Sequence, residues 1–119
     1  SSNFKIDFTT NIKEGELEEI KINIYRIVQE ALNNIQKHAK AKNVSVQFYI
    51  KKNVIWLSVE DDGIGFDLEK VKTETGKNNS HGLLNMIDRV KSMGGSIDID
   101  SNSKFGTNII ININLKNYA

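Results

Sequence analysis

Residues 25–39 read YRIVQEALNNIQKHA and form the centre of a stretch with the apolar spacing of a helix. Apolar side chains recur every three or four positions between residues 16 and 41, which predicts one amphipathic helix over this range. They are Leu17, Ile20, Ile24, Ile27, Val28, Ala31, Leu32, Ile35 and Ala39. Glutamates crowd the start of the range and lysines crowd its end, an arrangement that complements the helix dipole. Such a helix has to bury its apolar stripe against another layer of structure.

Four polar residues stand out on this helix. Glu30, Asn34 and His38 are four residues apart and share a face, with Lys37 beside them. An asparagine oxygen can bind Mg²⁺, a carboxylate can polarise a water or hydroxyl, and a lysine can meet a phosphate. The spacing alone is more typical of the solvated face of an amphipathic helix, so both interpretations stay open.

Shorter patterns around this helix predict five strands and a second helix. Alternating apolar and polar residues indicate strands, and apolar residues spaced three or four apart indicate a helix. The helix is expected at residues 81–93. The strands are expected at residues 4–8, 44–50, 54–60, 96–100 and 107–115. This order predicts an α+β two-layer sandwich, with a mixed, mostly antiparallel sheet of about five strands and helices packed on one face. Residues 54–60 are apolar on both faces, which favours a central strand, and Trp56 is expected in the core with the other aromatics. Residues 67–80 lack periodicity and are predicted to form a long loop.

The strand at 54–60 runs into the sequence DDGIG, residues 61–65. Its two glycines let the backbone approach a ligand closely or adopt positive φ. A carboxylate accepts a hydrogen bond from the exocyclic amine of adenine, whereas guanine presents an oxygen there. An ordinary Asp/Gly turn would have the same sequence. No GxGxxG motif opens a helix and no GxxxxGK[ST] occurs, which excludes a Rossmann fingerprint and a Walker A loop.

Two more short motifs lie further along the chain. Residues 80–84 read SHGLL and pass from loop into helix, where the free N–H groups of the first turn can bind an anion. A serine N-cap explains this motif without a ligand, and is the better interpretation of the motif taken alone. Residues 105–107, FGT, mark a turn that is most often a plain hairpin connection.

Composition limits the class of protein. The 119 residues are 39% hydrophobic and 26% charged, typical of a single globular domain, and the formal charge is +1. The near-neutral charge speaks against nucleic acid as a partner, and the lack of cysteine excludes disulfides and thiolate metal sites. No apolar run reaches membrane-spanning length and no leader is visible, so a cytoplasmic domain is expected, in a parent that could be membrane-anchored through other segments. Ser1 and Ser2 could be a cloning remnant, in which case residues 1–119 are one domain of a longer protein.

The order of the motifs is more specific than any one of them. The motifs follow one another in this order: a helix with ExxxN and a following histidine, DxGxG after a strand, HGL at the start of a helix, and GT before the last strand. This order resembles the ATP-binding catalytic domain of sensor histidine kinases. Residues 25–39 resemble the N box of the nitrate-sensor and desaturase-sensor branch, and residues 81–90, HGLLNMIDRV, resemble its second glycine box. The resemblance covers about residues 4–115 and implies the Bergerat-type ATP-binding fold shared with DNA gyrase B, Hsp90 and MutL.

The resemblance implies a role for each matching residue, with ATP and Mg²⁺ as cofactors. Asn34 would bind the Mg²⁺, and Glu30 would be the catalytic base or water-orienting group. The other ATP-binding residues would be Lys37, His38, Asp61, Gly63, Gly65, Gly82, Leu83 and Thr107. Of these, Asp61 would read the adenine amine, and residues 67–80 would be a mobile lid over ATP. Ser80 stands where the family often has glycine, a departure that bears on the lid.

The resemblance also implies partners outside this sequence. His38 and His81 both fall inside nucleotide motifs, so the phosphoacceptor histidine is expected on a separate helical dimerisation domain of the same parent. The parent is expected to be a homodimer that serves a response regulator in a two-component system, and the isolated domain to be monomeric. Two alternatives stay open: a stand-alone anti-sigma-factor-type serine kinase of the same fold, and a non-catalytic nucleotide-sensing module.

Overall fold

The computed structural model describes residues 4–38, 40–67, 69, 80–102 and 104–117. Within these residues, five strands, two helices of several turns and a short 3₁₀ turn follow one another. They are β1 (Lys5–Thr10), α1 (Glu18–His38), β2 (Asn43–Lys51), β3 (Val54–Asp61), α3 (Ser80–Ser92), β4 (Gly95–Asn102), β5 (Gly106–Asn114) and the turn Leu115–Asn117. Every predicted strand and both predicted helices are present, with ends that differ by a few residues.

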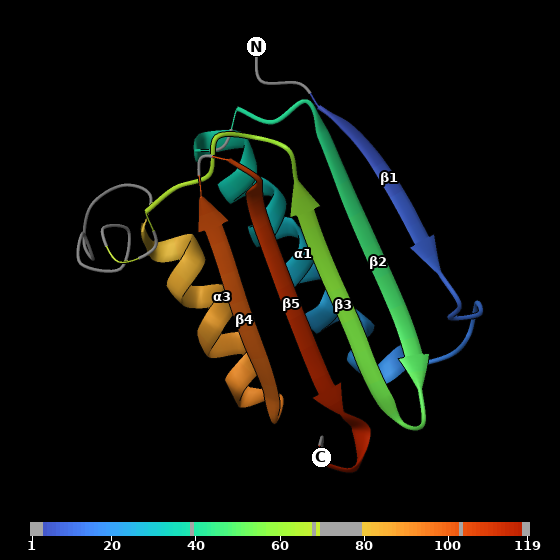
Figure 1. Ribbon diagram of the computed structural model, residues 1–119. Coiled ribbons are helices and arrows are strands. Elements are labelled where there is room, and N and C mark those ends of the chain that lie inside the picture. Colours follow the sequence, from blue (N-terminus) through green and yellow to red (C-terminus); the bar gives the residue numbers. More distant parts are fainter. Residues whose placement is uncertain (1–3, 39, 68, 70–79, 103, 118–119) are drawn as a thin grey trace.

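The five strands form one mixed sheet in the order β1-β2-β3-β5-β4, with β3 in the centre (Figure 1). Only the β1–β2 pair is parallel, and the other three pairs are antiparallel. The expected sheet and the central position of residues 54–60 are therefore confirmed. All six side chains of β1 are exposed, so this strand is joined to the sheet mainly through its backbone.

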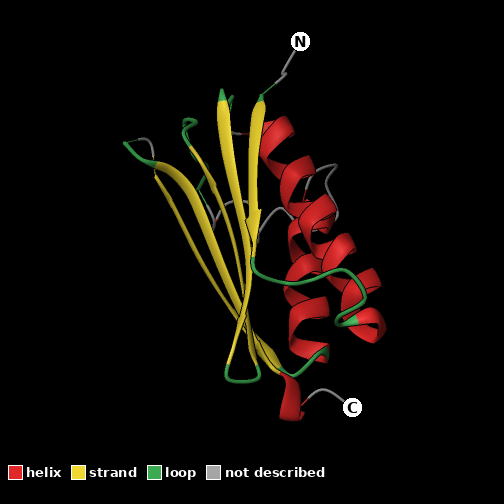
Figure 2. Ribbon diagram, turned by 90° about the vertical axis from the view of Figure 1, so that its right-hand side faces the viewer, coloured by secondary structure: helices red, strands yellow, loops and turns green. Residues whose placement is uncertain are grey.

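Helices α1 and α3 pack side by side on one face of the sheet and leave the other face open (Figure 2). The predicted apolar stripe explains this, because Ile20, Ile24, Ile27, Ala31 and Ile35 of α1 are all buried. Glu18 and Glu19 occupy the first turn of the helix, where they favour its dipole. Within the described residues, no helix combines the length and apolarity that crossing a bilayer requires.

The core lies between the helices and the inward side of the sheet. Strand side chains alternate between faces, so every second residue of a strand points at the helices. In β3 these inward positions are Ile55, Leu57, Val59 and Asp61, and in β5 they include Ile111, which is fully buried. A carboxylate thus ends the inward row of the central strand.

The expectation that Trp56 belongs to the core is wrong. Trp56 is 46% exposed because it lies on the open face of the sheet, beside Tyr49 and Ile110. Phe8 and Phe105 are more exposed still, at 58% and 77%. Apolar character on both faces of β3 predicted its central position correctly, but not which face the helices would cover.

The two faces of β5 allow a direct test of this layering. Ile111→Ala should lower the free energy of unfolding by about 2–5 kcal/mol, because it leaves a cavity in a close-packed core. Ile110→Ala, on the open face, should cost less than about 1 kcal/mol. Urea unfolding of the two variants measures both values, and equal losses would contradict a sheet with one covered face.

Candidate functional site

The four motifs come together at one end of the molecule. Figure 1 shows that β3 ends there, α1 ends there, α3 begins there, and the turn between β4 and β5 lies beside them. Two close approaches between motifs confirm this. A Cβ atom placed on Gly82 would stand 2.8 Å from Glu30 Oε2, and one placed on Gly106 would stand 2.8 Å from Asp61 Oδ1.

Asp61 is the most unusual residue of this region, because it is a carboxylic acid and the residue is only 2% exposed. One oxygen, Oδ1, accepts hydrogen bonds from the backbone N–H of Gly63 at 2.7 Å and of Thr107 at 3.4 Å. The other oxygen, Oδ2, is buried without any hydrogen-bond partner in the described structure. A buried acceptor left unpaired is costly, so this oxygen is suited to a ligand that donates a hydrogen bond.

The same geometry determines the direction in which the pKa of Asp61 is shifted. Burial raises the pKa of this carboxyl above its usual value, and hydrogen bonds from Gly63 and Thr107 act in the opposite direction. Thr107 is itself 1% exposed and supplies both its backbone N–H and its hydroxyl to this balance. Ionised Asp61 can only accept hydrogen bonds.

Two glycines allow the backbone to close around Asp61. Gly106 has a φ of +88° and lies against the Asp61 side chain, so any larger residue would be strained and crowded there. Gly65 has a φ of +71°, and a Cβ atom on it would stand 2.5 Å from the carbonyl oxygen of Asn102. Gly65 was expected in the site from the sequence, whereas Gly106 was noted only as part of a turn.

Glu30 and Asn34 lie on the side of α1 that meets the start of α3. Asn34 is 5% exposed, and its Nδ2 donates to the carbonyl oxygen of Glu30 at 3.0 Å. Its Oδ1 lies 3.7 Å from the position of a Cβ atom on Gly82. Asn34 is therefore not part of a solvated helix face, which removes that interpretation for the residue most suited to a metal.

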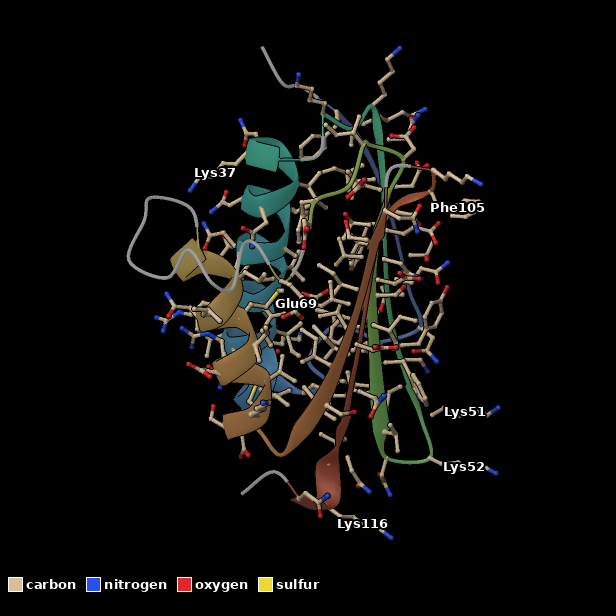
Figure 3. The ribbon with its side chains drawn as sticks, turned by 60° about the vertical axis from the view of Figure 1, so that its left-hand side comes forward. Lys37, Lys51, Lys52, Glu69, Phe105 and Lys116 are labelled. Atoms are coloured by element: carbon tan, nitrogen blue, oxygen red, sulfur yellow. The ribbon has the colours of Figure 1, made fainter. Side chains whose placement is uncertain are left out.

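The remaining predicted site residues differ in their surroundings. Lys37 is exposed and extends away from the sheet at the end of α1 (Figure 3). Leu83 is 1% exposed and its side chain belongs to the hydrophobic core. The side chain of His38 lies outside the described residues, as does most of the predicted lid, residues 68 and 70–79.

Two residues that the sequence interpretation did not assign also take part in this region. Asp62 Oδ1 accepts the backbone N–H groups of Lys42 and Asn43, both at 2.9 Å, and its Oδ2 accepts Asn43 Nδ2 at 2.9 Å. These bonds tie the end of β3 to the start of β2. Ser101 lies 2.9 Å from the Thr107 hydroxyl. No nearby sequence pattern predicts either set of hydrogen bonds. Asp62 bonds to residues about twenty positions earlier, and Ser101 bonds to a residue on the next strand.

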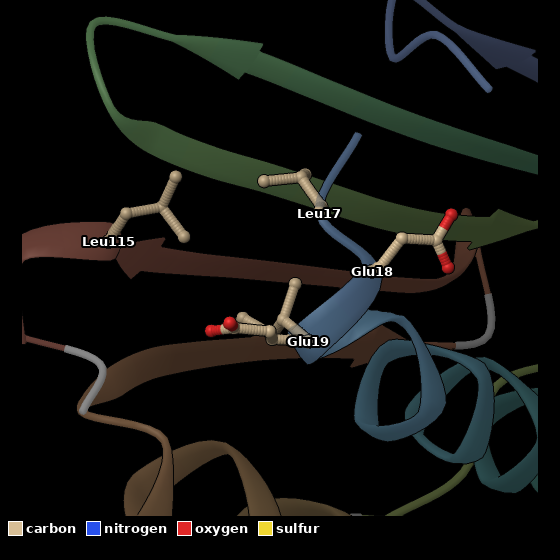
Figure 4. Close-up of a pocket in the computed structure, with 5 residues that line it drawn as sticks. Leu17, Glu18, Glu19 and Leu115 are labelled. Atoms are coloured by element: carbon tan, nitrogen blue, oxygen red, sulfur yellow. The ribbon is translucent and has the colours of Figure 1, made fainter. Parts of the chain in front are cut away.

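A hollow of about 400 Å³ lies at the opposite end of α1. Figure 4 shows Leu17 and Leu115 lining it together with the side chains of Glu18 and Glu19. Glu18 precedes Asn34 by sixteen residues, a helical rise of roughly 24 Å. The described residues that line this hollow supply carboxylates and apolar groups, which do not suit a polyphosphate, so the hollow is separate from the motif region.

Comparison with known proteins agrees with this arrangement. The family described as histidine kinase-, DNA gyrase B-, and HSP90-like ATPase matches residues 19–117. The histidine-protein kinase/phosphatase DegS of Bacillus subtilis is 37% identical over 97 residues, covering 82% of this chain and 25% of the relative. Sensor histidine kinase LiaS of the same species is 34% identical over 109 residues, covering 91% and 29%. The chain thus spans little more than a quarter of the length of these relatives.

Solved structures share the fold. The histidine kinase domain of the blue-light activated kinase from Erythrobacter litoralis EL346 aligns with a TM-score of 0.74 over 97% of this chain and 56% of that chain. Its sequence identity is 22%, so this likeness concerns the fold alone. The expected fold class is confirmed, whereas the individual site residues stay predictions.

The contacts of Asp62 predict a pH-dependent contribution to stability. Hydrogen bonds from the backbone and side chain of Asn43, and then from the backbone of Lys42, lower the pKa of Asp62 to about 2. Because this pKa is lower in the folded state, the stabilisation is complete above the unfolded value of about 3.9 and is lost as pH falls toward 2. Asp62→Asn should therefore be less stable than the wild type at pH 7, and the difference should shrink between pH 4 and pH 2.5.

Urea unfolding across this pH range measures the difference. Asp98→Asn, on the exposed side of β4, is the matched control and should change stability little at any of these pH values. A loss in Asp62→Asn that is independent of pH would show that the carboxylate charge is not what ties β3 to β2.

Proposed function

Since the chain belongs to the histidine kinase-, DNA gyrase B-, and HSP90-like ATPase family, we propose that it binds Mg²⁺-ATP and donates the γ-phosphoryl group to a histidine on a separate dimerisation domain. The observation that carries this proposal is the unpaired, buried Oδ2 of Asp61. It is supported by relatives that are named histidine kinases. Such a domain would act within a two-component signalling system.

Adenine fits the chemistry of Asp61. Its exocyclic amine donates a hydrogen bond, whereas the oxygen at the same position of guanine would face an acceptor with no proton to offer. The backbone N–H groups of Gly63 and Thr107 hold the carboxylate from the other side, at Oδ1. Base selection in this proposal therefore depends on one buried oxygen.

The phosphates would lie toward α1 and the start of α3. The first-turn N–H groups of α3 favour negative charge. Gly82, which has no side chain, lets Glu30 and Asn34 come close to this turn. Asn34 suits Mg²⁺ because its Nδ2 is held by the carbonyl of Glu30, which leaves its oxygen for a metal. A bound Mg²⁺ would neutralise phosphate charge during transfer. Glu30 would orient or deprotonate the attacking group.

The phosphoacceptor is proposed to belong to another part of the parent protein. His38 and His81 lie at the end of α1 and in the first turn of α3, within the nucleotide motifs. A helical dimerisation domain would bring the acceptor histidine, and a response regulator would take the phosphoryl group from it. These partners fit the length of the relatives, of which this chain matches only part.

Asp61→Asn tests the adenine assignment. Replacing an acceptor-only group by an amide mismatches the adenine amine, so ATP affinity should fall about five- to 150-fold, equivalent to roughly 1–3 kcal/mol. Because burial raises the pKa of Asp61, the ionised carboxylate opposes folding at pH 7, and the variant should unfold at the same or higher urea concentration. Titration calorimetry and urea unfolding measure the two effects; unchanged ATP affinity would remove Asp61 from this role.

Phosphoryl transfer provides the second test. The domain alone should show negligible labelling from γ-labelled ATP, because transfer depends on a positioned acceptor. Adding the dimerisation helices of the parent should restore acid-labile labelling of a histidine. In that complex Asn34→Ala should abolish transfer, and Glu30→Gln should slow transfer with ATP affinity largely kept.

The stability of the label separates the alternatives. Strong acid-stable labelling of the isolated domain would favour the serine-kinase interpretation, since phosphoserine survives acid and phosphohistidine does not. Binding of ATP with no transfer even in the presence of the helices would favour a nucleotide-sensing module.

A further inference from the structure

The hydroxyl of Ser101, near the end of β4, connects two parts of the candidate site. Its Oγ accepts the backbone N–H of Phe66 at 2.8 Å, and it lies 2.9 Å from Thr107 Oγ1. Phe66 follows the DDGIG motif, while Thr107 lies beside Asp61. One side chain therefore holds both the segment after the glycines and the residue that contacts the buried carboxylate.

The hydrogen bonds around Ser101 reach the carboxylate through the backbone. A backbone N–H can only donate, so the Ser101 oxygen accepts from Phe66, and the two hydroxyls of Ser101 and Thr107 share a bond in which either can donate. The backbone N–H of Thr107 in turn donates to Asp61 Oδ1. Ser101 therefore holds the residue whose backbone contacts the buried carboxylate, and neighbouring bonds of this kind strengthen one another.

We propose that Ser101 is a positioning residue for base recognition, which holds Thr107 and the segment at Phe66 in place around Asp61 and so keeps Oδ2 placed as the acceptor for a purine amine. This inference rests on the proposed binding of ATP. Ser101 does not contact the base in this scheme; it acts through Thr107 and through the segment held at Phe66.

Removing the Ser101 hydroxyl should weaken selection of the base more than binding of the nucleotide as a whole. Without it, Thr107 loses its side-chain hydrogen-bond partner on β4, and the backbone N–H of Phe66 loses the acceptor that Ser101 provides. Gly65 packs against the backbone of Asn102, and the residue that follows it, Phe66, would no longer be bonded to Ser101. The advantage of a purine with an amine over one with a carbonyl at that position would then become smaller.

The test compares ATP with ITP, which differ at the position that Asp61 would read, the amine of ATP being replaced by a carbonyl. Titration calorimetry with Mg²⁺ gives the ratio of the two affinities for the wild type and for Ser101→Ala. The ratio should fall about five- to thirty-fold in Ser101→Ala, mainly through weaker ATP binding. Ser101→Thr keeps the hydroxyl and should preserve the ratio.

Ser96→Ala is the matched control. Ser96 lies on the same strand, and its hydroxyl makes a comparable bond of 2.8 Å, to Asn112 Oδ1, at the far end of the sheet. This variant should leave the ATP/ITP ratio unchanged. A loss of strand stability alone would lower both affinities together in either variant and leave the ratio as it is.

The outcomes separate this inference from the proposed function. A wild type that binds ATP and ITP equally would overturn the adenine assignment and the inference with it. A wild type that prefers ATP, with the same preference in Ser101→Ala, would overturn the role of Ser101 alone. If Ser101→Ala does not fold, Ser101→Cys, with its weaker hydrogen-bonding thiol, should show an intermediate ratio, and a wild-type ratio in it would also overturn the inference.

Discussion

The arrangement of this domain depends on a carboxylate that must stay buried at the end of the central strand. The two-residue period of β3 makes Asp61 the continuation of an inward row that begins with Ile55, Leu57 and Val59. The register that buries those three residues therefore also buries the charge. Only one of its two oxygens is paired within the described structure, so the free domain keeps an unfavourable group that a suitable ligand can satisfy. The unpaired Oδ2 of Asp61 thus lowers the stability of the free domain and, at the same time, provides the acceptor for a ligand.

The surrounding backbone is shaped by that carboxylate. Gly106 comes so close to Asp61 that a side chain would collide with it, and Gly65 comes equally close to Asn102. On the helical side, Gly82 makes the corresponding approach to Glu30. The glycines of three separate motifs therefore lie where two elements touch, which explains why motifs that look like ordinary turns in the sequence form one region in space. The motif residues lie at the ends of strands and at the start of a helix, and the hydrophobic core holds these strands and helices in place.

Local periodicity was sufficient to predict the elements of the fold, because helix and strand spacing are properties of neighbouring residues. It predicted α1 to within a few residues and β3 as the central strand. It was wrong for Trp56, since alternation shows that a strand has two faces but not which of them a helix covers. The role of Ser101 was out of reach for a similar reason: its bond to Phe66 joins residues 35 positions apart, and nothing nearby in the sequence marks it. The role of Lys37 came from its charge and from resemblance, that of Leu83 from resemblance alone, and both stay predictions.

The exposed side chains of β1 have a consequence for how the domain opens. This strand fully buries no side chain. The contacts that hold it include the backbone ladder to β2 and polar bonds such as that of Thr10 to Phe48. Little apolar surface would be uncovered if it separated, so its detachment has a lower free energy than opening of the four remaining strands. Those four strands hold Asp61, Ser101 and Thr107 by themselves. The sheet is consequently expected to open as two cooperative units, a loosely held edge and a stable interior, and Asp61, Ser101 and Thr107 all belong to the interior.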